Sequence, residues 1–174
     1  MLNSLKFFIT TSIKEALINL DASPMTNSLT TMLFKEITFN SDGYRKTLEL
    51  RTKILRAPLG KQLSEVDLRG EQDQLHFGVF DNEMLVACVV IKPIKDGTTG
   101  KLRQMAVDGS VQGQGIGKFI ISQTEANLLE KGFLNIEMAA RATAIGFYQN
   151  LGYSSVGDPF LEQGIEHIRM VKKL

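Results

Sequence analysis

The sequence contains a single cysteine, Cys88, among its 174 residues. A lone cysteine forms no disulfide within its own chain, and this one lies inside the apolar run 84–91. We therefore expect a reduced, buried thiol without a nucleophilic role, in a cytoplasmic protein. The sequence also lacks any apolar stretch approaching the ~20 residues that a helix needs to cross a bilayer, which excludes a membrane-spanning topology.

An excess of charge of either sign is also missing. Lys and Arg number 20, and Asp and Glu number 19, so the formal net charge is +1. Proteins that attract nucleic acid or an anionic membrane through general electrostatics have a clear positive excess. We expect neither partner and predict a small-molecule ligand, and the near-neutral balance argues against a strongly acidic or basic one.

The length suits one domain, since single domains usually run to roughly 100 to 200 residues. Hydrophobic residues make up 43% of the sequence and charged residues 22%, proportions typical of a globular protein. No internal repeat or low-complexity tract divides it. Residues 1–31 are richer in Ser, Thr and Asn than the rest, so we predict an N-terminal extension over 1–31 and a domain over 32–174.

The extension has apolar residues at helical spacing, which predicts an amphipathic helix packed on the domain or on a second subunit. The polar run 10–12 interrupts its apolar part and the charged pair 14–15 follows, so we expect no secretory leader. Met25 and Met32 are alternative starts of the protein.

The domain begins with the pattern of a strand followed by a helix. Residues 32–39 are β-like, and Ser41-Asp42-Gly43 supplies a helix cap. A helical pattern that includes Arg51 follows and ends at Pro58-Leu59-Gly60. We expect the basic residues to lie on the solvent-exposed face of this helix. Residues 61–74 predict a loop or a short helix.

A β-hairpin and a longer helix follow. Residues 75–80 and 84–92 predict a hairpin whose second strand is apolar throughout and covered on both faces, and residues 101–107 predict a third antiparallel strand. The glycine-rich turn 111–117 leads into a helix that ends at Lys131-Gly132. The α/β sheet is completed by a strand at 134–139, a short helix at 142–151, and strands around 153–156 and 165–172.

The glycine-rich turn is the most informative motif. Glycines let successive backbone N–H groups point into one concavity at the start of a helix, and such a nest binds phosphate. A nucleotide-triphosphate loop is excluded, because the spacing from Gly113 to Gly117 is one residue short and Phe119 stands where Ser or Thr is required. A dinucleotide fingerprint is excluded because the third glycine is placed differently and the preceding hairpin is antiparallel.

The turn instead resembles the acetyl-CoA motif Q/R-x-x-G-x-G/A of the GNAT family of N-acetyltransferases, matched by Gln112, Gly115 and Gly117 between a strand and a helix. The resemblance extends through residues 102–107 upstream and 146–153 downstream, in the family's order and at its usual separations. It covers the whole predicted domain and leaves the extension outside.

The last predicted strand has the pattern G-I-x-H-x-x-M from Gly164 to Met170, which resembles a small bacterial subgroup of the same family. The resemblance implies the GNAT fold, of mixed α/β (α+β) class. In that fold a central, mostly antiparallel, twisted sheet of about six or seven strands is splayed after the fourth strand and flanked by helices. The resemblance also implies acetyl-CoA as the cosubstrate, with no metal.

The resemblance implies a V-shaped opening between the strands 101–107 and 134–139, in which the pantetheine arm of acetyl-CoA lies. Backbone atoms of Met105, Ala106 and Val107 would bond this arm. Many relatives have Asn where this chain has Thr143, which is shorter but still able to bond the arm. Backbone amides of the glycine loop would hold the pyrophosphate. These amides belong to Gln112, Gly113, Gln114, Gly115, Ile116, Gly117 and Lys118.

Tyr148 matches the family tyrosine that donates a proton to the leaving thiolate, and we expect it to be the general acid, although it could also simply pack on a short helix. Many family members deprotonate the amine through ordered water, so the base is less defined. His167 is the first candidate for the base, because imidazole titrates near neutral pH. A structural role for His167, as a hydrogen-bonded residue of the strand, is an equal alternative. Glu162 ranks second, and His76 is expected to be structural.

The activity that the resemblance implies is direct transfer of an acetyl group to a primary amine of a small molecule or peptide. The alternative is an acyl-CoA-binding module without turnover, against which the intact loop and Tyr148 argue. The acceptor pocket comes from the helix 44–58, the loop that follows it and the last strands, where family members differ most, so the sequence does not define the acceptor. Dimers are common in the family, and a homodimer is compatible with the sequence.

Overall fold

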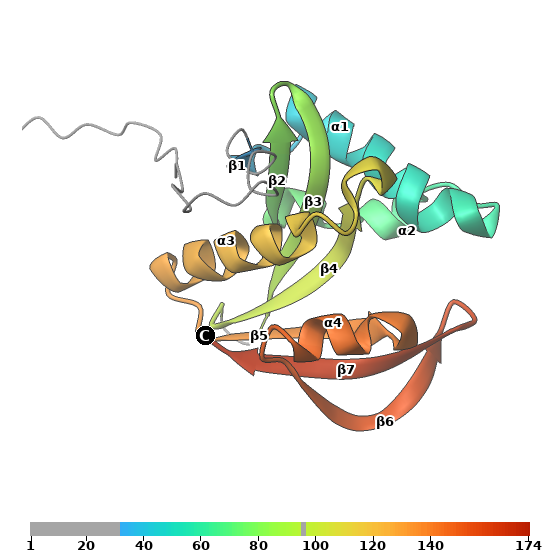
Figure 1. The fold of residues 1–174 in the computed structure, drawn as a ribbon, viewed down its shortest axis with the longest axis vertical. Coiled ribbons are helices and arrows are strands. Elements are labelled where there is room, and N and C mark those ends of the chain that lie inside the picture. Colours follow the sequence, from blue (N-terminus) through green and yellow to red (C-terminus); the bar gives the residue numbers. More distant parts are fainter. Residues whose placement is uncertain (1–31, 95–96) are drawn as a thin grey trace, which may run out of the picture.

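The computed structural model describes residues 32–94 and 97–174, which form one sheet with helices on both faces (Figure 1). In this part of the chain seven strands hydrogen-bond in the order β1-β2-β3-β4-β5-β7-β6. Every neighbouring pair is antiparallel except β4 and β5, which are parallel. The strands are β1 (Met32–Ile37), β2 (Leu75–Asp81), β3 (Met84–Ile94), β4 (Thr99–Val107), β5 (Asn135–Arg141), β6 (Ser154–Glu162) and β7 (Ile165–Lys173). The helix predicted for residues 1–31 lies outside the described residues.

The helices connect and cover these strands. Ser41 begins α1, since its side chain accepts a hydrogen bond from the amide of Tyr44 at 3.2 Å. None of the helices in residues 32–94 and 97–174 has the length and apolar character needed to span a membrane. The helices are α1 (Asp42–Arg51), which continues through a π-helical turn (Thr52–Arg56) and a 3-10 turn (Ala57–Leu59), α2 (Glu65–Leu68), α3 (Ile116–Glu130) and α4 (Ile145–Gln149).

The sheet is buried on both faces at its centre. On one face, Leu50 of α1 packs with Cys88 of β3 and Ala106 of β4. On the other face, α3 packs into the main core through Ile120 and its neighbours. Because side chains alternate along a strand, β3 is apolar on both sides, and every residue from 86 to 91 is buried, as the sequence predicts.

The other predicted elements of the first three-quarters of the domain are confirmed. The hairpin turns at Asn82, which has a φ of 52°, and β4 pairs antiparallel with β3. The segment predicted as a loop or short helix contains α2. The helix after the glycine turn buries one face, formed by Ile116, Ile120, Thr124 and Leu128.

The prediction that the basic residues of the first helix lie on its wet face is wrong at two positions. Arg45 and Lys53 are exposed, but Arg51 is completely buried and Arg56 is nearly so. Each buried guanidinium lies within 2.8 Å of a carboxylate oxygen from the segment after the helix. Such pairing makes burial of a charge tolerable. The spacing of residues along the helix does not reveal which basic residues have a carboxylate partner.

Strand β6 is longer than the sequence pattern indicates. The prediction ended at Val156, whereas β6 continues to Glu162 at the edge of the sheet. Its register with β7 is irregular between Val156 and Phe160, around Gly157 and Pro159. An edge strand tolerates glycine, proline and a bulge because only one of its sides is paired, so the usual alternation of apolar residues is missing.

Gly78 in β2 provides a test of the packing between α1 and the hairpin. A Cβ atom added there would lie 2.6 Å from Leu85 Cδ1 and 2.7 Å from Ile37 Cδ1. We expect Gly78→Ala to lower the free energy of unfolding by about 1 kcal/mol, because the Leu85 and Ile37 methyl groups must shift to admit the added one. Urea unfolding of the variant measures this loss.

The matched control is Gly146→Ala in α4, where a Cβ atom would have no neighbour within 4 Å. Alanine favours a helix over glycine by roughly 0.5–1 kcal/mol, so this variant is expected to be at least as stable as the wild type. Equal unfolding midpoints for the two variants would contradict the packing argument.

Candidate active site

The parallel strands β4 and β5 separate part-way along their length. Their pairing runs from Thr99 opposite Asn135 to Leu102 opposite Met138 and goes no further. Both strands continue, β4 to Val107 and β5 to Arg141. Because backbone groups beyond the last pair have no partner on the neighbouring strand, this V-shaped opening can accept an extended ligand as an added strand.

A β-bulge in β4 lies just after the point of separation. Between Cys88 and Val90 the β3 chain advances two residues, while its partners in β4, Ala106 and Arg103, are three residues apart. The additional residue bends the strand. Gln104 lies in this bulge with a φ of 48°, a left-handed conformation that is uncommon for residues other than glycine.

The side chain of Gln104 connects the bulge to both helices that cover it. Its Oε1 accepts a hydrogen bond from Arg51 Nε of α1 at 2.9 Å. Its Nε2 donates to the carbonyl oxygen of Asp67 in α2 at 3.1 Å. The bulge is therefore held by two helices that come from an earlier part of the chain.

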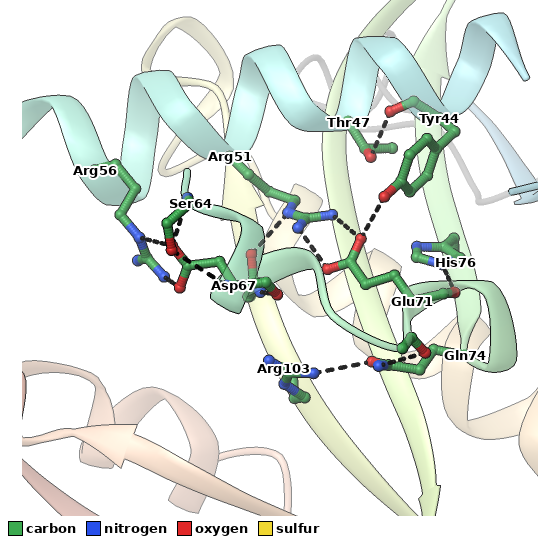
Figure 2. Close-up of polar contacts among 12 residues, drawn as sticks. Tyr44, Thr47, Arg51, Arg56, Ser64, Asp67, Glu71, Gln74, His76 and Arg103 are labelled. Atoms are coloured by element: carbon green, nitrogen blue, oxygen red, sulfur yellow. Dashed lines mark hydrogen bonds and ion pairs between the residues drawn. The ribbon is translucent and has the colours of Figure 1, made fainter. Parts of the chain in front are cut away.

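Arg51 forms a buried ion pair with Glu71, and both side chains are 0% exposed. The two guanidinium nitrogens donate to the two carboxylate oxygens at 2.6 and 3.1 Å, and the hydroxyl of Tyr44 donates to the same carboxylate at 2.7 Å. Figure 2 shows these groups directed toward one another beneath α1. A bidentate arrangement of this kind fixes geometry as well as charge.

His76 belongs to this structural network, as expected. Its Nε2 lies 2.9 Å from the carbonyl oxygen of Glu71, which can only accept, so this nitrogen is the donor. Burial lowers the pKa of His76, which favours the neutral ring. The residue is 1% exposed and does not line the cavity described below, so it has no access to a substrate there.

The glycine loop lies directly after β4. Gly113 and Gly115 have φ values of 78° and 83°, and Gly115 caps α3. The first backbone hydrogen bond at the start of the helix runs from Phe119 to Gly115, at 2.9 Å. The amides of residues 116–118 precede this bond and have no acceptor within the helix, and together with the helix dipole they form a site suited to phosphate.

Side chains of the loop stabilise this shape and leave its backbone accessible. Gln112 Nε2 donates to the carbonyl oxygen of Val107 at 3.0 Å, and Gln114 Nε2 donates to that of Ser110 at 3.1 Å. A carbonyl oxygen has two lone pairs, so Val107 keeps one acceptor position. Residues 112–115 and Lys118 are exposed, so the segment predicted to bind pyrophosphate is open to a ligand.

The separated strands open into a cavity of about 700 Å³ between the α1–α2 segment, β4, β5 and the β6–β7 turn. It brings together the three residues proposed for catalysis, Tyr148, His167 and Glu162, with Met105 of β4. The glycine loop and Thr143 do not line this cavity. Thr143 is exposed on the turn before α4, while Ala106 is buried against α1, so only the backbone of Ala106 is available to a ligand.

Tyr148 of α4 lies at the wall of the cavity, with 8% of its surface exposed. Its hydroxyl is 3.5 Å from Met105 Sδ, a contact in which the hydroxyl donates to sulfur. Burial raises the pKa of Tyr148 to about 12, so the phenol stays protonated near neutral pH. The ring also packs against Phe147 and Tyr153. Tyr148 therefore has the packing role considered as the alternative, and it lies at the cavity as well.

His167 of β7 presents one ring nitrogen that is able to accept a proton. Its Nδ1 lies 2.8 Å from the carbonyl oxygen of Ile165, which requires Nδ1 to be the donor and leaves Nε2 as the acceptor. The ring also stacks on Phe160. Glu162 lies at the exposed end of β6, on the same side of the cavity.

The sequence reasoning missed three residues that shape this site, namely Arg51, Glu71 and Gln104. Arg51 occurs at helical spacing with apolar residues of α1, and a cation at such a position is a signal for a buried pair. Glu71 and Gln104 give no comparable signal. Their roles depend on contacts with residues 20 to 53 positions away in the chain.

The sequence matches the family model for an acetyltransferase (GNAT) domain over residues 46–174. The chain belongs to the GNAT acetyltransferase family. It is 36% identical over 78 residues to the uncharacterized protein YyaT of Bacillus subtilis (strain 168), a match that covers 45% of this chain and about half, 53%, of YyaT. It is 29% identical over 134 residues to the uncharacterized N-acetyltransferase YitI of the same strain, covering 74% of this chain and 90% of YitI.

The fold is also shared with solved structures of the family. A GNAT family acetyltransferase from Elizabethkingia anophelis with acetyl-CoA bound superimposes with a TM-score of 0.64. The superposition covers 83% of this chain and 99% of the other, at 16% sequence identity. The predicted GNAT fold, with a mostly antiparallel sheet that separates after the fourth strand, is therefore confirmed.

Proposed function

We propose that this protein is a cytoplasmic N-acetyltransferase that moves the acetyl group of acetyl-CoA directly onto a primary amine of a small molecule or peptide. The observation that supports this most strongly is the separation of β4 from β5 beside an accessible glycine loop, with the hydroxyl of Tyr148 at the same cavity. The relative with acetyl-CoA bound shares this fold and supports the choice of cosubstrate.

In this proposal the two ends of acetyl-CoA are bound by different parts of the β4–α3 segment. The pantetheine arm lies along the backbone of residues 105–107, where β4 has no neighbour on the β5 side. The pyrophosphate lies on the amides of residues 112–118, at the positive end of the α3 dipole. The acetyl group then reaches the cavity beside Met105 and Tyr148.

The reaction forms a C–N bond and breaks the C–S bond of the thioester. An alkylamine with a pKa near ~10.4 must first lose a proton. His167 Nε2 is the acceptor we propose for it, directly or through water, with Glu162 as the second choice. The electron pair of the broken bond goes to sulfur, where the Tyr148 hydroxyl stabilises it. The nitrogen loses a second proton as the amide forms, and this proton converts the thiolate to the free thiol.

The environment of Tyr148 defines its role more closely. A free thiol has a pKa of ~8.5, whereas burial raises the pKa of Tyr148 to about 12. The phenol is the weaker acid in water as well, with a pKa of ~10 against ~8.5 for the thiol, so complete transfer of its proton to the thiolate is uphill. Tyr148 acts mainly by donating a hydrogen bond to the developing negative charge on sulfur.

Release of free thiol from acetyl-CoA tests the function directly, with a panel of polyamines, amino acids, aminoglycosides and peptide N-termini as acceptors. Thiol release that depends on one class of amine supports the enzyme. Binding of acetyl-CoA without release for any amine would favour a non-catalytic acyl-CoA-binding module. Calorimetry that shows no affinity for acetyl-CoA would reject both.

Gly115→Val tests the cofactor loop. The left-handed backbone at this position is strained for a β-branched residue, so the loop amides are expected to lose their arrangement. We expect the Kd for acetyl-CoA to rise at least about tenfold, the equivalent of losing one charge-assisted hydrogen bond. Isothermal titration calorimetry measures the change.

The control is Gly132→Val, which introduces the same strain at the other end of α3, where φ is 86° and a Cβ atom would have no neighbour within 4 Å. Its stability should fall by a similar amount while its affinity for acetyl-CoA stays that of the wild type. Equal loss of affinity in both variants would show that general destabilisation, and not the loop, is responsible.

A further inference from the structure

The cavity at the separated strands has an excess of positive charge, although the whole chain has a net charge of only +1. Two of its three carboxylates are neutralised, since Asp67 pairs with Arg56 at 2.8 Å and Glu137 pairs with Arg169 at 2.6 Å. Glu162 is the third. Five lining cations form no ion pair within the described part of the chain: Arg69, Lys92, Lys101, Arg103 and Arg141.

These cations lie on the acceptor side of the sheet and not at the phosphate-binding loop. Ile136, Met138 and Ala140 of β5 pack into the core beneath α3. Because side chains alternate along a strand, Glu137 and Arg141 lie on the opposite face. No residue of the glycine loop lines the cavity, so the phosphates of acetyl-CoA do not account for its charge.

Arg141 lies beside the proposed base. It is directly opposite His167 in the antiparallel pairing of β5 with β7. Side chains at such positions have Cβ atoms about 4.5–5.5 Å apart on the same face of the sheet. Arg141 is half-buried, and its guanidinium can bind a planar oxyanion with two parallel hydrogen bonds.

Two further cations face each other across β3 and β4, since Lys92 is opposite Lys101 in the register. Like charges at directly opposite positions destabilise a sheet. The carboxylate of Glu137, which is opposite Lys101 in the β4–β5 register, already pairs with Arg169, so an anion in the cavity would relieve the repulsion further. The four-residue separation of residues 137 and 141 along β5 places this pair about 13 Å from Arg141. Lys92 and Lys101 therefore attract an anion through long-range electrostatics, while Arg141 contacts the anion beside His167.

We infer that the acceptor amine also has an anionic group, a carboxylate or a phosphate, which Arg141 binds while the amine lies near His167. This inference depends on the proposed function and specifies its substrate class. It revises the expectation from net charge, because a cavity concentrates the potential of its own lining and not that of the whole protein.

Matched amines that differ by one anionic group test the inference in the thiol-release assay. The pairs are tyramine with tyrosine, which probes a carboxylate, and ethanolamine with phosphoethanolamine, which probes a phosphate. In at least one pair the anionic member should have a kcat/KM about tenfold higher or more. That advantage should fall as ionic strength rises, because the steering charges are exposed. The inference would be overturned if, in both pairs, the neutral amine had a kcat/KM equal to that of its anionic partner.

Arg141→Gln assigns the effect to one residue. It is expected to raise KM for the anionic member about 10- to 100-fold, the loss expected for a charge-assisted hydrogen bond, and to leave KM for the neutral member within about twofold. Comparing wild type and variant on the same amine cancels differences in amine basicity. The control Arg45→Gln removes the same charge from the exposed side of α1 and should change neither value.

Calorimetry separates failure of this inference from failure of the proposed function. Inorganic phosphate and N-acetyltyrosine are titrated into the protein saturated with coenzyme A. The wild type should bind at least one of them about tenfold more tightly than Arg141→Gln does, even if no amine is acetylated. Acetyl-CoA binding together with equal anion affinities in the two proteins would overturn the acceptor class and leave the acetyl-CoA site in place.

Discussion

Replacing Arg51 by methionine is expected to lower the free energy of unfolding by about 3–5 kcal/mol, because the substitution leaves a buried carboxylate without its counter-charge. The carboxylate is that of Glu71, which is completely buried and lies 2.6 Å from the Arg51 guanidinium. The same change removes the hydrogen bond to Gln104 that holds the β4 bulge. Urea or thermal unfolding measures the loss.

Two comparisons separate burial from charge. Arg45→Met removes an equivalent cation from the same helix, where the partner Asp42 and Arg45 itself are 69% and 65% exposed. Exposed pairs contribute about 0–1 kcal/mol, so this control should be close to wild type. The double variant Arg51→Met with Glu71→Met should be more stable than Arg51→Met alone, since no uncompensated charge remains. An Arg51→Met protein as stable as the Arg45→Met protein would contradict the account.

Replacing Tyr148 by phenylalanine is expected to lower kcat at least about tenfold and to leave the affinity for acetyl-CoA unchanged. Within the described part of the chain the hydroxyl donates one hydrogen bond, to Met105 Sδ at 3.5 Å, so removing the hydroxyl is expected to disturb the structure little. In the proposed reaction it donates a hydrogen bond to the leaving sulfur, and removing one donor of this kind costs a factor of ~10² to 10³ in kcat. Steady-state kinetics and calorimetry measure the two quantities.

The pH dependence adds a second readout for the same residue. In the proposed reaction the functional form of Tyr148 is the protonated one, and burial raises its pKa to about 12. Its contribution is therefore expected to be present at lower pH and to be lost only as the pH rises through about 12. Between pH 7 and 10 the ratio of wild-type to Tyr148→Phe activity should therefore be constant. A ratio that falls toward one near pH 10 would show a phenol with an ordinary pKa.

Tyr153→Phe is the matched control for Tyr148→Phe. Tyr153 is buried beside Tyr148, but its hydroxyl donates to Glu125 at 2.8 Å and does not line the cavity. Losing this hydrogen bond should lower the stability by about 1 kcal/mol and leave kcat unchanged. A kcat for Tyr148→Phe equal to that of the wild type would remove Tyr148 from the mechanism.

Local patterns in the chain were sufficient for most of the elements and for the shape of the glycine loop. The apolar run of β3, the periodicity of α3 and the glycines before it depend on residues that are close in sequence, so spacing reveals them. Gly113 and Gly115 adopt the left-handed conformation for which glycine is suited. Tyr148, His167 and Glu162 were recognised by motif and residue type, and they line one cavity.

The geometry of the site, in contrast, follows from contacts between distant segments. Gln104 adopts a left-handed conformation without being glycine, and its side chain bonds Arg51, 53 residues earlier in the chain. The burial of Arg51 and the bend in β4 therefore depend on partners that no local pattern identifies. The same holds for the charge of the cavity, because sheet register, and not composition, brings Lys92 opposite Lys101 and Arg141 opposite His167. Residue spacing thus identified the family, while long-range pairing decided where the strands separate and which charges line the cavity.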